Sequence, residues 1–359
     1  MRIIFPVASV WRSTEVLYAR DLGRALADRG WGVTVYTRDA NEVDTLFRES
    51  SLSLRHLRMG GLADISSTWN FSRNLALEPQ GTVVLAQTFA GAFMALAARR
   101  LAKRSDIKVY LTLHRSVEPH TTLLARKVYR SLDGIIFSSA YARRLFKKPW
   151  TTMPVDKKKL HVVRNSLAFP PPPRTEEPKG PVIGMFMGDI APMKGLETLI
   201  DALPVLRGNR VRLCMAGRGN PDYIDSLRRR AINSGVMDLI SWKTSRSDSF
   251  MELIGKAHFG VFPYGSAHAF GYYNLEFMAA GLPQIVTATH VAAEYIGVRG
   301  GALLVPADDV AALGESMLAM GQNAALRGEY GRQALHRFND ALPFDRFLAL
   351  TEAILTDAE

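Results

Sequence analysis

A single carboxylate, Glu276, stands in an apolar run that begins just after Gly271, in the stretch HAFGYYNLEFMAAGLP (268–283). The segment before it, FGVFPY (259–264), is short and apolar, so we expect a strand, a loop and then a helix that begins near Tyr272. The first amides of a helix are not bonded within it, and they attract anions. Glu276 would lie one turn further in, where a carboxylate can accept two hydrogen bonds from a vicinal diol such as that of ribose.

This loop and helix start form the first predicted ligand-binding segment. Because glycine has no side chain, Gly271 would let a ligand come close to the backbone. The predicted set consists of His268, Phe270, Gly271, Tyr272, Tyr273, Asn274 and Glu276. The simpler alternative for Glu276 is an acidic residue in a first helical turn that only favours the helix dipole.

Two more strand-to-helix turns carry residues suited to a phosphate. The stretch MGDIAPMKGLETLIDAL (187–203) ends a strand near Gly188 and Asp189 and starts a helix at Lys194. A lysine is unfavourable beside the positive end of a helix, so its presence there favours a bound anion. The second turn, AGRGN (216–220), offers Gly217 after another apolar strand, although glycine turns of this kind are common.

The first half of the chain contributes a histidine and a polar turn. KVYLTLH (108–114) predicts a buried strand that ends in His114, and a histidine at the carboxyl end of a strand is a candidate for binding or catalysis. In FPVASVWRST (5–14), the first strand-to-helix turn, Arg12 and Ser13 are candidates for contact with a second substrate. A structural role for a lone histidine is the alternative.

Several other chemistries have no support in the sequence. A phosphate-binding P-loop, the H-E-x-x-H zinc motif, a Cys/His cluster and the G-x-S-x-G hydrolase motif are all absent. The single cysteine, Cys214, lies in an apolar run and cannot form an internal disulfide, which fits a reducing compartment. Asp308 and Asp309 precede a helical pattern and are best explained as its N-terminal cap. None of these residue patterns indicates a metal or a cofactor.

The chain of 359 residues predicts an α/β protein of two Rossmann-like, doubly wound domains. Short apolar strands alternate with longer amphipathic helices on both sides of the proline-rich segment AFPPPPRTEEPKGP (168–181), and such alternation indicates parallel sheets covered on both faces. The predicted parts are a first domain 1–169, a linker 170–181, a second domain 182–338 and a C-terminal helix 339–359. We expect ligands at the carboxyl ends of the strands, in a cleft between the domains.

Positive charge is concentrated in the first half of the chain. Residues 1–179 hold 29 Lys and Arg against 15 Asp and Glu, whereas the whole chain has a net charge of +11. Such an excess favours an anionic membrane surface, while the scarcity of interleaved aromatic residues argues against nucleic acid. The longest apolar stretch, 83–98, is too short and too polar to span a bilayer. We expect a cytoplasmic protein, in solution or on the inner face of the membrane.

Taken together, these turns resemble the retaining GT-B glycosyltransferases of family 4. The segment 188–203 is similar to the family's Gly-Arg-…-Lys-Gly phosphate segment, and AFGYYNLEFMAAGLPQIVT (269–287) is similar to its paired-glutamate signature. In the first half, YLTLHRS (110–116) resembles the family's T-x-H-G strand end, and LHVVRNS (160–166) resembles its V-I-P-N-G stretch. The resemblance covers nearly the whole chain and is stronger after the linker.

This resemblance implies a hexosyltransferase that moves a sugar from a nucleoside diphosphate donor to a glycan or lipid-linked acceptor in polysaccharide biosynthesis. Lys194 would hold the donor diphosphate, Glu276 its ribose and His114 the transferred sugar. The first domain would bind the acceptor, the second the nucleotide sugar, and the C-terminal helix would cross back to the first domain. Transfer would retain the anomeric configuration without a metal, since Lys194 and helix ends would stabilise the leaving group.

Three departures from the family pattern keep a second interpretation open. Asp189 replaces the phosphate arginine, His268 replaces the first glutamate of the signature, and ASVWRST (8–14) stands where the family has a glycine pair. A GT-B-like protein that has lost transfer activity and acts as a partner or scaffold is therefore the alternative. A sugar-nucleotide epimerase or a phosphorylase on the same fold is a third interpretation, although no lysine stands out for pyridoxal phosphate.

Overall fold

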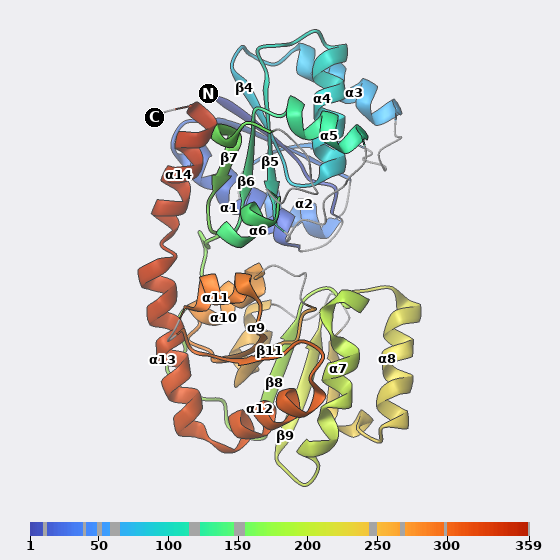
Figure 1. The fold of residues 1–359 in the computed structure, drawn as a ribbon, viewed down its shortest axis with the longest axis vertical. Coiled ribbons are helices and arrows are strands. Elements are labelled where there is room, and N and C mark those ends of the chain that lie inside the picture. Colours follow the sequence, from blue (N-terminus) through green and yellow to red (C-terminus); the bar gives the residue numbers. More distant parts are fainter. Residues whose placement is uncertain are drawn as a thin grey trace. The chain divides into compact units, whose positions relative to one another are not determined.

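The computed structural model describes residues 1–9, 13–38, 41–48, 52–57, 65–114, 123–146, 155–243, 250–265, 270–297 and 300–357. The chain divides into two compact units, Met1–Ala168 with Phe344–Glu359 and Phe169–Pro343. Each unit is a parallel sheet covered by helices (Figure 1). The expected α/β architecture of two doubly wound units is confirmed. Among the described residues, no helix is long and apolar enough to cross a bilayer.

The first unit contains a seven-stranded sheet in the order β3-β2-β1-β4-β5-β6-β7. Its strands are β1 (Arg2–Pro6), β2 (Gly32–Thr37), β3 (Ser53–His56), β4 (Thr82–Ala86), β5 (Lys108–Leu113), β6 (Gly134–Phe137) and β7 (Leu160–Val162). Its helices are α1 (Thr14–Asp28), α2 (Asn41–Arg48), α3 (Ile65–Ala76), α4 (Phe89–Leu101), α5 (Leu123–Ser131), α6 (Ala140–Phe146) and α14 (Phe344–Thr356). Because all pairings are parallel, the strands end at one common edge.

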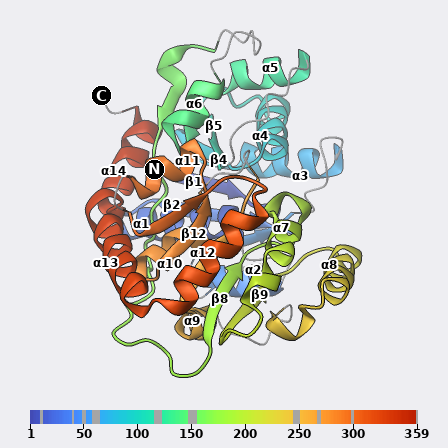
Figure 2. The ribbon, with the colours of Figure 1, turned by 60° about the horizontal axis from the view of Figure 1, so that its bottom comes forward.

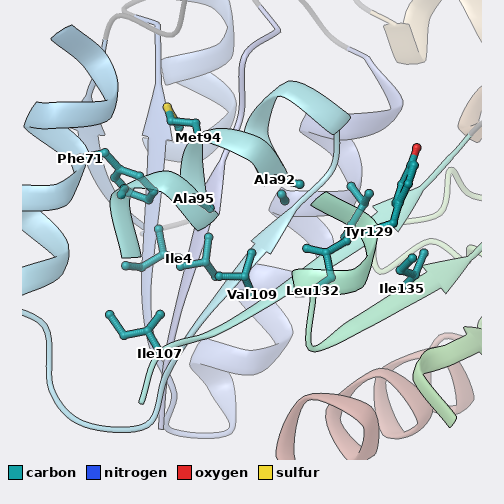
Figure 3. Close-up of a cluster of buried hydrophobic side chains, with 14 of the residues drawn as sticks. Ile4, Phe71, Ala92, Met94, Ala95, Ile107, Val109, Tyr129, Leu132 and Ile135 are labelled. Carbon is teal, nitrogen blue, oxygen red and sulfur yellow. The ribbon is translucent and has the colours of Figure 1, made fainter. Parts of the chain in front are cut away.

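Alternate residues of β1 face opposite helix layers, since successive side chains of a strand point to opposite sides of the sheet. Phe5 packs toward α1, where its ring lies 3.5 Å from the position that a Cβ on Gly23 would take. Ile4 belongs to the buried cluster on the other face, which is covered by α3, α4 and α5. These three helices lie together in both ribbon views (Figures 1 and 2). Figure 3 shows side chains of these helices, among them Phe71, Ala95 and Tyr129, in the buried cluster that also contains Ile4, Val109 and Ile135 of the sheet.

The last helix, α14, packs within the first unit although it follows the second unit in the chain. Glu352 accepts a hydrogen bond from Trp31 Nε1 at 3.0 Å. Asp357 accepts one from the hydroxyl of Tyr110 at 2.9 Å. These contacts join residues more than 240 positions apart in sequence, so the docking of α14 is a purely tertiary feature.

The break before α14 lies at Pro343, which differs from the predicted helix 339–359. The preceding helix, α13, runs over Ala324–Ala341, and the next begins at Phe344. Proline has no backbone N–H and clashes with the preceding turn, so α13 cannot continue through Pro343. Residues 339–341 therefore belong to α13 of the second unit.

The second unit contains a six-stranded sheet in the order β10-β9-β8-β11-β12-β13. Its strands are β8 (Val182–Met187), β9 (Val211–Ala216), β10 (Ile240–Lys243), β11 (Phe259–Phe262), β12 (Gln284–Thr287) and β13 (Ala302–Val305). Its helices are α7 (Leu196–Asp201), α8 (Pro221–Asn233), α9 (Phe250–Lys256), α10 (Tyr272–Ala279), α11 (His290–Ile296), α12 (Val310–Gln322) and α13. Here too every described strand pairing is parallel.

The proline-rich segment is anchored to the second unit and does not act as a free spacer. Glu177 forms two hydrogen bonds of 2.8 Å with the buried guanidinium of Arg327 on α13. The carbonyl of Pro178 accepts from Nε2 of His258 at 3.0 Å, and Nδ1 of His258 accepts from the amide of Ile183 at 3.0 Å. Both ring nitrogens of His258 are thus used in the neutral form of the ring.

His258 makes the second unit sensitive to acid. Burial lowers the pKa of His258, with smaller opposing effects of the Pro178 carbonyl and of Glu177. The ring of His258 therefore stays neutral in the folded protein, whereas in the unfolded chain it takes up a proton below about pH 6.5. The free energy of unfolding thus decreases as the pH falls from about 6.5 toward the pKa of His258 in the folded protein. Each pKa unit by which folding lowers the pKa of His258 corresponds to about 1.4 kcal/mol of unfolding free energy.

We expect the His258→Asn variant to be less stable than the parent protein at about pH 8 but to lose less stability between about pH 8 and about pH 5.5. Urea unfolding of both proteins across this range measures the difference. The exposed His336, changed to Asn, is the matched control and should leave the slope unchanged. Parallel pH curves for His258→Asn and the parent would contradict this role.

Candidate functional site

The carboxyl edge of the second sheet gathers most of the predicted ligand-binding residues. The strands β9, β8 and β11 are direct neighbours, and all three end at this edge. The loop after β8 carries Gly188, Asp189 and Lys194, the loop after β9 carries Gly217, and α10 with Glu276 follows β11. The sheet order therefore brings together residues that lie up to 88 positions apart in the chain.

Glycines allow the backbones of these loops to touch. A Cβ on Gly217, whose φ is +152°, would lie 1.8 Å from the carbonyl oxygen of Gly188. A Cβ on Gly195, whose φ is +66°, would lie 1.9 Å from the carbonyl oxygen of Pro263. Both positions thus require glycine for conformation and for space. Gly217, which the sequence marks as a ligand-binding residue, has at least this structural role.

Lys194 lies over an aromatic ring that follows β11. Its Nζ is 4.7 Å from the ring centroid of Tyr264, within the range of a cation–π contact. The loops are also joined by a hydrogen bond of 3.3 Å from the amide of Gly265 to the carbonyl of Met193. This contact places a positive charge at the carboxyl edge of β8 and β11, as a phosphate site requires.

Asp189 belongs to the same group of side chains. Burial raises the pKa of the Tyr264 hydroxyl, and the charges of Tyr273 and Asp189 raise it further. Tyr264 is therefore a protonated hydrogen-bond donor at physiological pH. A carboxylate acting on the ring that holds Lys194 reduces the positive potential of this site.

The first turn of α10 is held by a network of buried amides. The side-chain oxygen of Asn274 accepts from the amide of Gly271 at 3.1 Å, and its nitrogen donates to Gln284 Oε1 at 2.9 Å. The nitrogen of Gln284 donates back to the carbonyl of Asn274 at 3.0 Å. The side chain of Asn274 is fully buried. It positions the helix start, and only its backbone amide remains for an anion.

Two more of the predicted binding residues turn their side chains inward. Phe270 is buried and stacks on Tyr295 of α11, with ring centroids 4.9 Å apart and planes inclined by 15°. The side chain of Tyr272 is also buried. The helix N-terminus therefore offers its ligand mainly backbone amides, which point out of the first turn.

Gly271 differs from the other glycines at this edge. Its φ of −92° and ψ of 172° are open to any residue. Among the described residues, which do not include 266–269, the nearest atom to a Cβ there would be Asn274 Oδ1, at 3.8 Å. Neither the backbone conformation nor packing against the described residues requires glycine here. The absence of a side chain instead leaves space in front of the helix amides, as close approach of a ligand would demand.

Glu276 is a buried carboxylate on α10. Only 3% of the residue is exposed, and its neighbours Leu275 and Phe277 are fully buried. Burying a carboxylate is unfavourable unless hydrogen bonds or charges compensate it. The structure thus places the carboxylate in the interior of α10, and its contact with a ribose diol stays a prediction.

In the first unit, His114 follows β5 and is buried. Its Nε2 lies 3.1 Å from Oε1 of Gln87, the residue after β4. Its ring meets the ring of Tyr18 from α1 edge-on, with centroids 4.8 Å apart. The histidine is thus held from two sides at the carboxyl edge of the first sheet.

The remaining predicted residues are Ser13, Arg12 and His268. Ser13 is the N-cap of α1, because its hydroxyl accepts from the amide of Val16 at 3.4 Å. Arg12 and His268 lie outside the described residues. Among those that are described, no group of three or more His, Cys, Asp and Glu side chains could hold a metal ion. The carboxyl edge of the second sheet presents a lysine, the first amides of α10 and a tyrosine hydroxyl, which are groups suited to an anion.

Sequence reasoning missed Gln87 and Tyr264. Gln87 comes directly after β4, and Tyr264 comes two residues after β11, at the end of the predicted strand 259–264. That position was the available signal, since parallel strands bring their carboxyl ends to one edge. Neither an amide nor a phenol is a type that stands out by itself as catalytic.

Two family models match the chain, one in each half. Residues 16–167 match the model described as Glycosyltransferase Family 4. Residues 181–323 match the model described as Glycosyl transferases group 1. The first match lies in the first unit and the second in the second unit.

Curated relatives and solved structures also match this chain. A phosphatidyl-myo-inositol mannosyltransferase of Mycobacterium leprae is 30% identical over 181 residues, which cover 48% of this chain and 46%, about half, of that protein. A D-inositol 3-phosphate glycosyltransferase of Jonesia denitrificans is 24% identical, covering 81% of this chain and 78% of its own. The structure of HepE from Anabaena in complex with UDP and glucose matches with a TM-score of 0.83 at 15% identity, over 99% of both chains. A glycosyltransferase structure from Rickettsia africae has a TM-score of 0.79 at 15% identity, over 99% of this chain and 98% of its own.

We expect the glycines of this edge to respond differently to alanine. Gly195→Ala and Gly217→Ala should each lose about 1–3 kcal/mol of unfolding free energy or more, because their Cβ atoms would overlap carbonyl oxygens. Gly271→Ala should keep or slightly raise the stability, by up to about 1 kcal/mol, because the unfolded chain loses freedom. Urea unfolding measures all three, and a strongly destabilised Gly271→Ala would show that its glycine serves folding.

Proposed function

Because the chain belongs to the family 4, group 1 glycosyltransferases and has their GT-B fold, we propose that it moves a sugar from a nucleoside diphosphate sugar to a glycan or lipid-linked acceptor. Transfer retains the anomeric configuration and needs no metal in this proposal. Its place is in the synthesis of a cell-surface polysaccharide, at the cytoplasmic face of the membrane.

One observation carries the donor part of the proposal: Lys194 lies on Tyr264 at the sheet edge where α10 begins. Tyr273 of α10 lies against Gly188, whose Cβ position is 3.8 Å from the tyrosine ring. Lys194 and the first amides of α10 are thus suited to a diphosphate, and Glu276 further along the helix to a ribose diol. This arrangement stabilises the diphosphate as it leaves the sugar.

The names of the similar proteins support this assignment. HepE binds UDP and glucose in the matched structure, and another structure of HepE holds UDP-glucose. The two curated relatives are named for transfer to phosphatidyl-myo-inositol and to D-inositol 3-phosphate. An acceptor that carries a phosphate would suit the basic first unit of this chain.

The other predicted residues take the remaining roles. His114 contacts the transferred sugar, and His268 donates a hydrogen bond to one of its hydroxyl groups. Arg12 and Ser13 contact the acceptor in this proposal, Ser13 through its backbone because its hydroxyl caps α1. Asp189 weakens the hold on the diphosphate, since its carboxylate acts on the same tyrosine as Lys194.

We expect a nucleoside diphosphate sugar to raise the melting temperature, in a screen of UDP-, GDP- and ADP-sugars with EDTA present. Lys194→Gln should weaken binding of the best donor by about 10–100-fold, the effect of one charge-assisted hydrogen bond. Gly271→Ala should weaken it without loss of stability, because the new methyl group would stand before the helix amides. Calorimetric titration measures both variants.

Asp189→Asn is the opposite control for the same site. Removal of this negative charge should tighten donor binding, most clearly at low salt where charges are least screened. If no nucleotide sugar stabilises the parent protein or Asp189→Asn, the chain is instead a GT-B-like partner or scaffold. Weaker binding by Asp189→Asn would mean that the carboxylate itself contacts the donor.

The first unit also has a face suited to an anionic membrane. It holds 28 Lys and Arg against 17 Asp and Glu, whereas the second unit holds 17 against 17. The helices α3, α4 and α5 lie near one another (Figure 2). Their sequences contain no acidic residue. They expose large apolar side chains, namely Ile65 at 82%, Trp69 at 57% and Leu123 at 81%. Basic helices with exposed tryptophan and leucine bind lipid interfaces.

We expect the protein to sediment with phosphatidylglycerol vesicles and to be released by salt, because each lysine or arginine near the surface contributes about 1 kcal/mol. The double change Ile65→Ser and Trp69→Ser should reduce binding. Ile232, which is 60% exposed on α8, provides the matched control as Ile232→Ser. Equal binding of all three proteins would contradict the assignment of this face.

A further inference from the structure

Among the described residues, Gln87 is a polar side chain that contacts the imidazole ring of His114. It follows β4 directly, and the register that pairs Ala86 with Leu111 of β5 places it beside the end of the strand that carries His114. Its Oε1 lies 3.1 Å from Nε2 of the histidine. Both residues are buried, Gln87 at 4% exposure, so this hydrogen bond is shielded from water.

The other side of the ring is fixed by an apolar contact. The ring of Tyr18 meets His114 at a centroid distance of 4.8 Å and an inclination of 67°. Tyr18 is itself held, because its hydroxyl accepts from Thr112 at 3.4 Å and its ring meets Phe347 of α14. Burial raises the pKa of Tyr18 to about 12, so it stays neutral. Tyr18 orients the plane of the histidine but does not select which nitrogen carries the proton.

The folded protein gains little from an amide at position 87. A buried amide is unfavourable where its hydrogen bonds are incomplete, and Nε2 of Gln87 has no partner in the described part of the chain. A methionine would fill the same space without that loss. The amide is therefore explained better by its action on His114 than by the stability of the fold.

The hydrogen bond between the amide oxygen of Gln87 and Nε2 determines which ring nitrogen of His114 carries the proton. The oxygen accepts a hydrogen bond only if Nε2 carries the proton, and the neutral ring then has its lone pair on Nδ1. A ring in this form acts as an acceptor at Nδ1, so its partner there must be an N–H or O–H group. A glutamine does not ionise, so it sets this form without favouring the imidazolium.

We propose that Gln87 is a positioning residue that holds His114 in the neutral tautomer with the proton on Nε2. The buried Nδ1 is then the acceptor of the ring, toward an O–H or N–H group. A contact of His114 with the transferred sugar rests on the proposed function, whereas the tautomer does not.

Long-range ¹⁵N–¹H correlation spectra of histidine-labelled protein test the tautomer directly, with His114→Gln to assign the signal. The parent protein should show His114 protonated at Nε2. Gln87→Met should give mixed or Nδ1-protonated His114, and Gln87→Glu, which has the same shape, should give the imidazolium. Thr112→Val, which changes a neighbouring contact of Tyr18, is the matched control and should leave the tautomer as in the parent.

Donor turnover tests the consequence for catalysis. With the nucleotide sugar that binds best, Gln87→Met and Gln87→Glu should lower kcat by about 10–100-fold with little change in KM, because the ring is misplaced or wrongly protonated. A parent protein protonated at Nδ1, or an unchanged tautomer in both Gln87 variants, would overturn the proposal. If the spectra agree but the parent turns over no donor, the positioning role of Gln87 stands and the proposed function fails.

Discussion

The candidate site depends on the contact of backbone with backbone at the carboxyl edge of the second sheet. Gly217 touches the carbonyl of Gly188, and Gly195 touches the carbonyl of Pro263, at distances that no side chain would allow. These contacts join three strand ends and set the start of the lysine loop beside the strand that leads into α10. Without them Lys194 would not lie on Tyr264, and the positive charge would not share an edge with the helix amides.

In both units, buried polar side chains hold the predicted functional groups, namely the start of α10 and the ring of His114. Asn274 and Gln284 satisfy each other and fix the start of α10, so their amides carry little unfavourable free energy. Gln87 is different, since an amide nitrogen without a partner among the described residues reduces stability when buried. Such local losses are typical of sites where function and folding compete. They distinguish side chains that build the site from side chains that act in it.

Much of the architecture follows from local patterns in the sequence. The alternation of apolar strands and amphipathic helices predicted two doubly wound units, and the strand-to-helix turns led to Gly188, Lys194 and His114. The inward turn of Phe270 and Asn274 was not predictable, because they stand in the predicted loop and in the first turn of the predicted helix, where side chains can face either solvent or protein. Their burial depends on Tyr295 and Gln284, which come later in the chain and reach them only through the sheet order.

The sequence by itself thus determined the hydrophobic periodicity of the strands and helices and their order along the chain. It also determined the positive charge of the first half and the strand-to-helix turns that carry candidate functional residues. These properties depend on residues that lie within one or two turns of each other. Only the tertiary structure decided that Gln87 contacts His114, that Tyr264 lies under Lys194 and that the linker and α14 are anchored by Arg327 and Trp31. Each of these contacts joins segments whose separation along the chain carries no local signal, because packing of the sheets, and not spacing, brings them together.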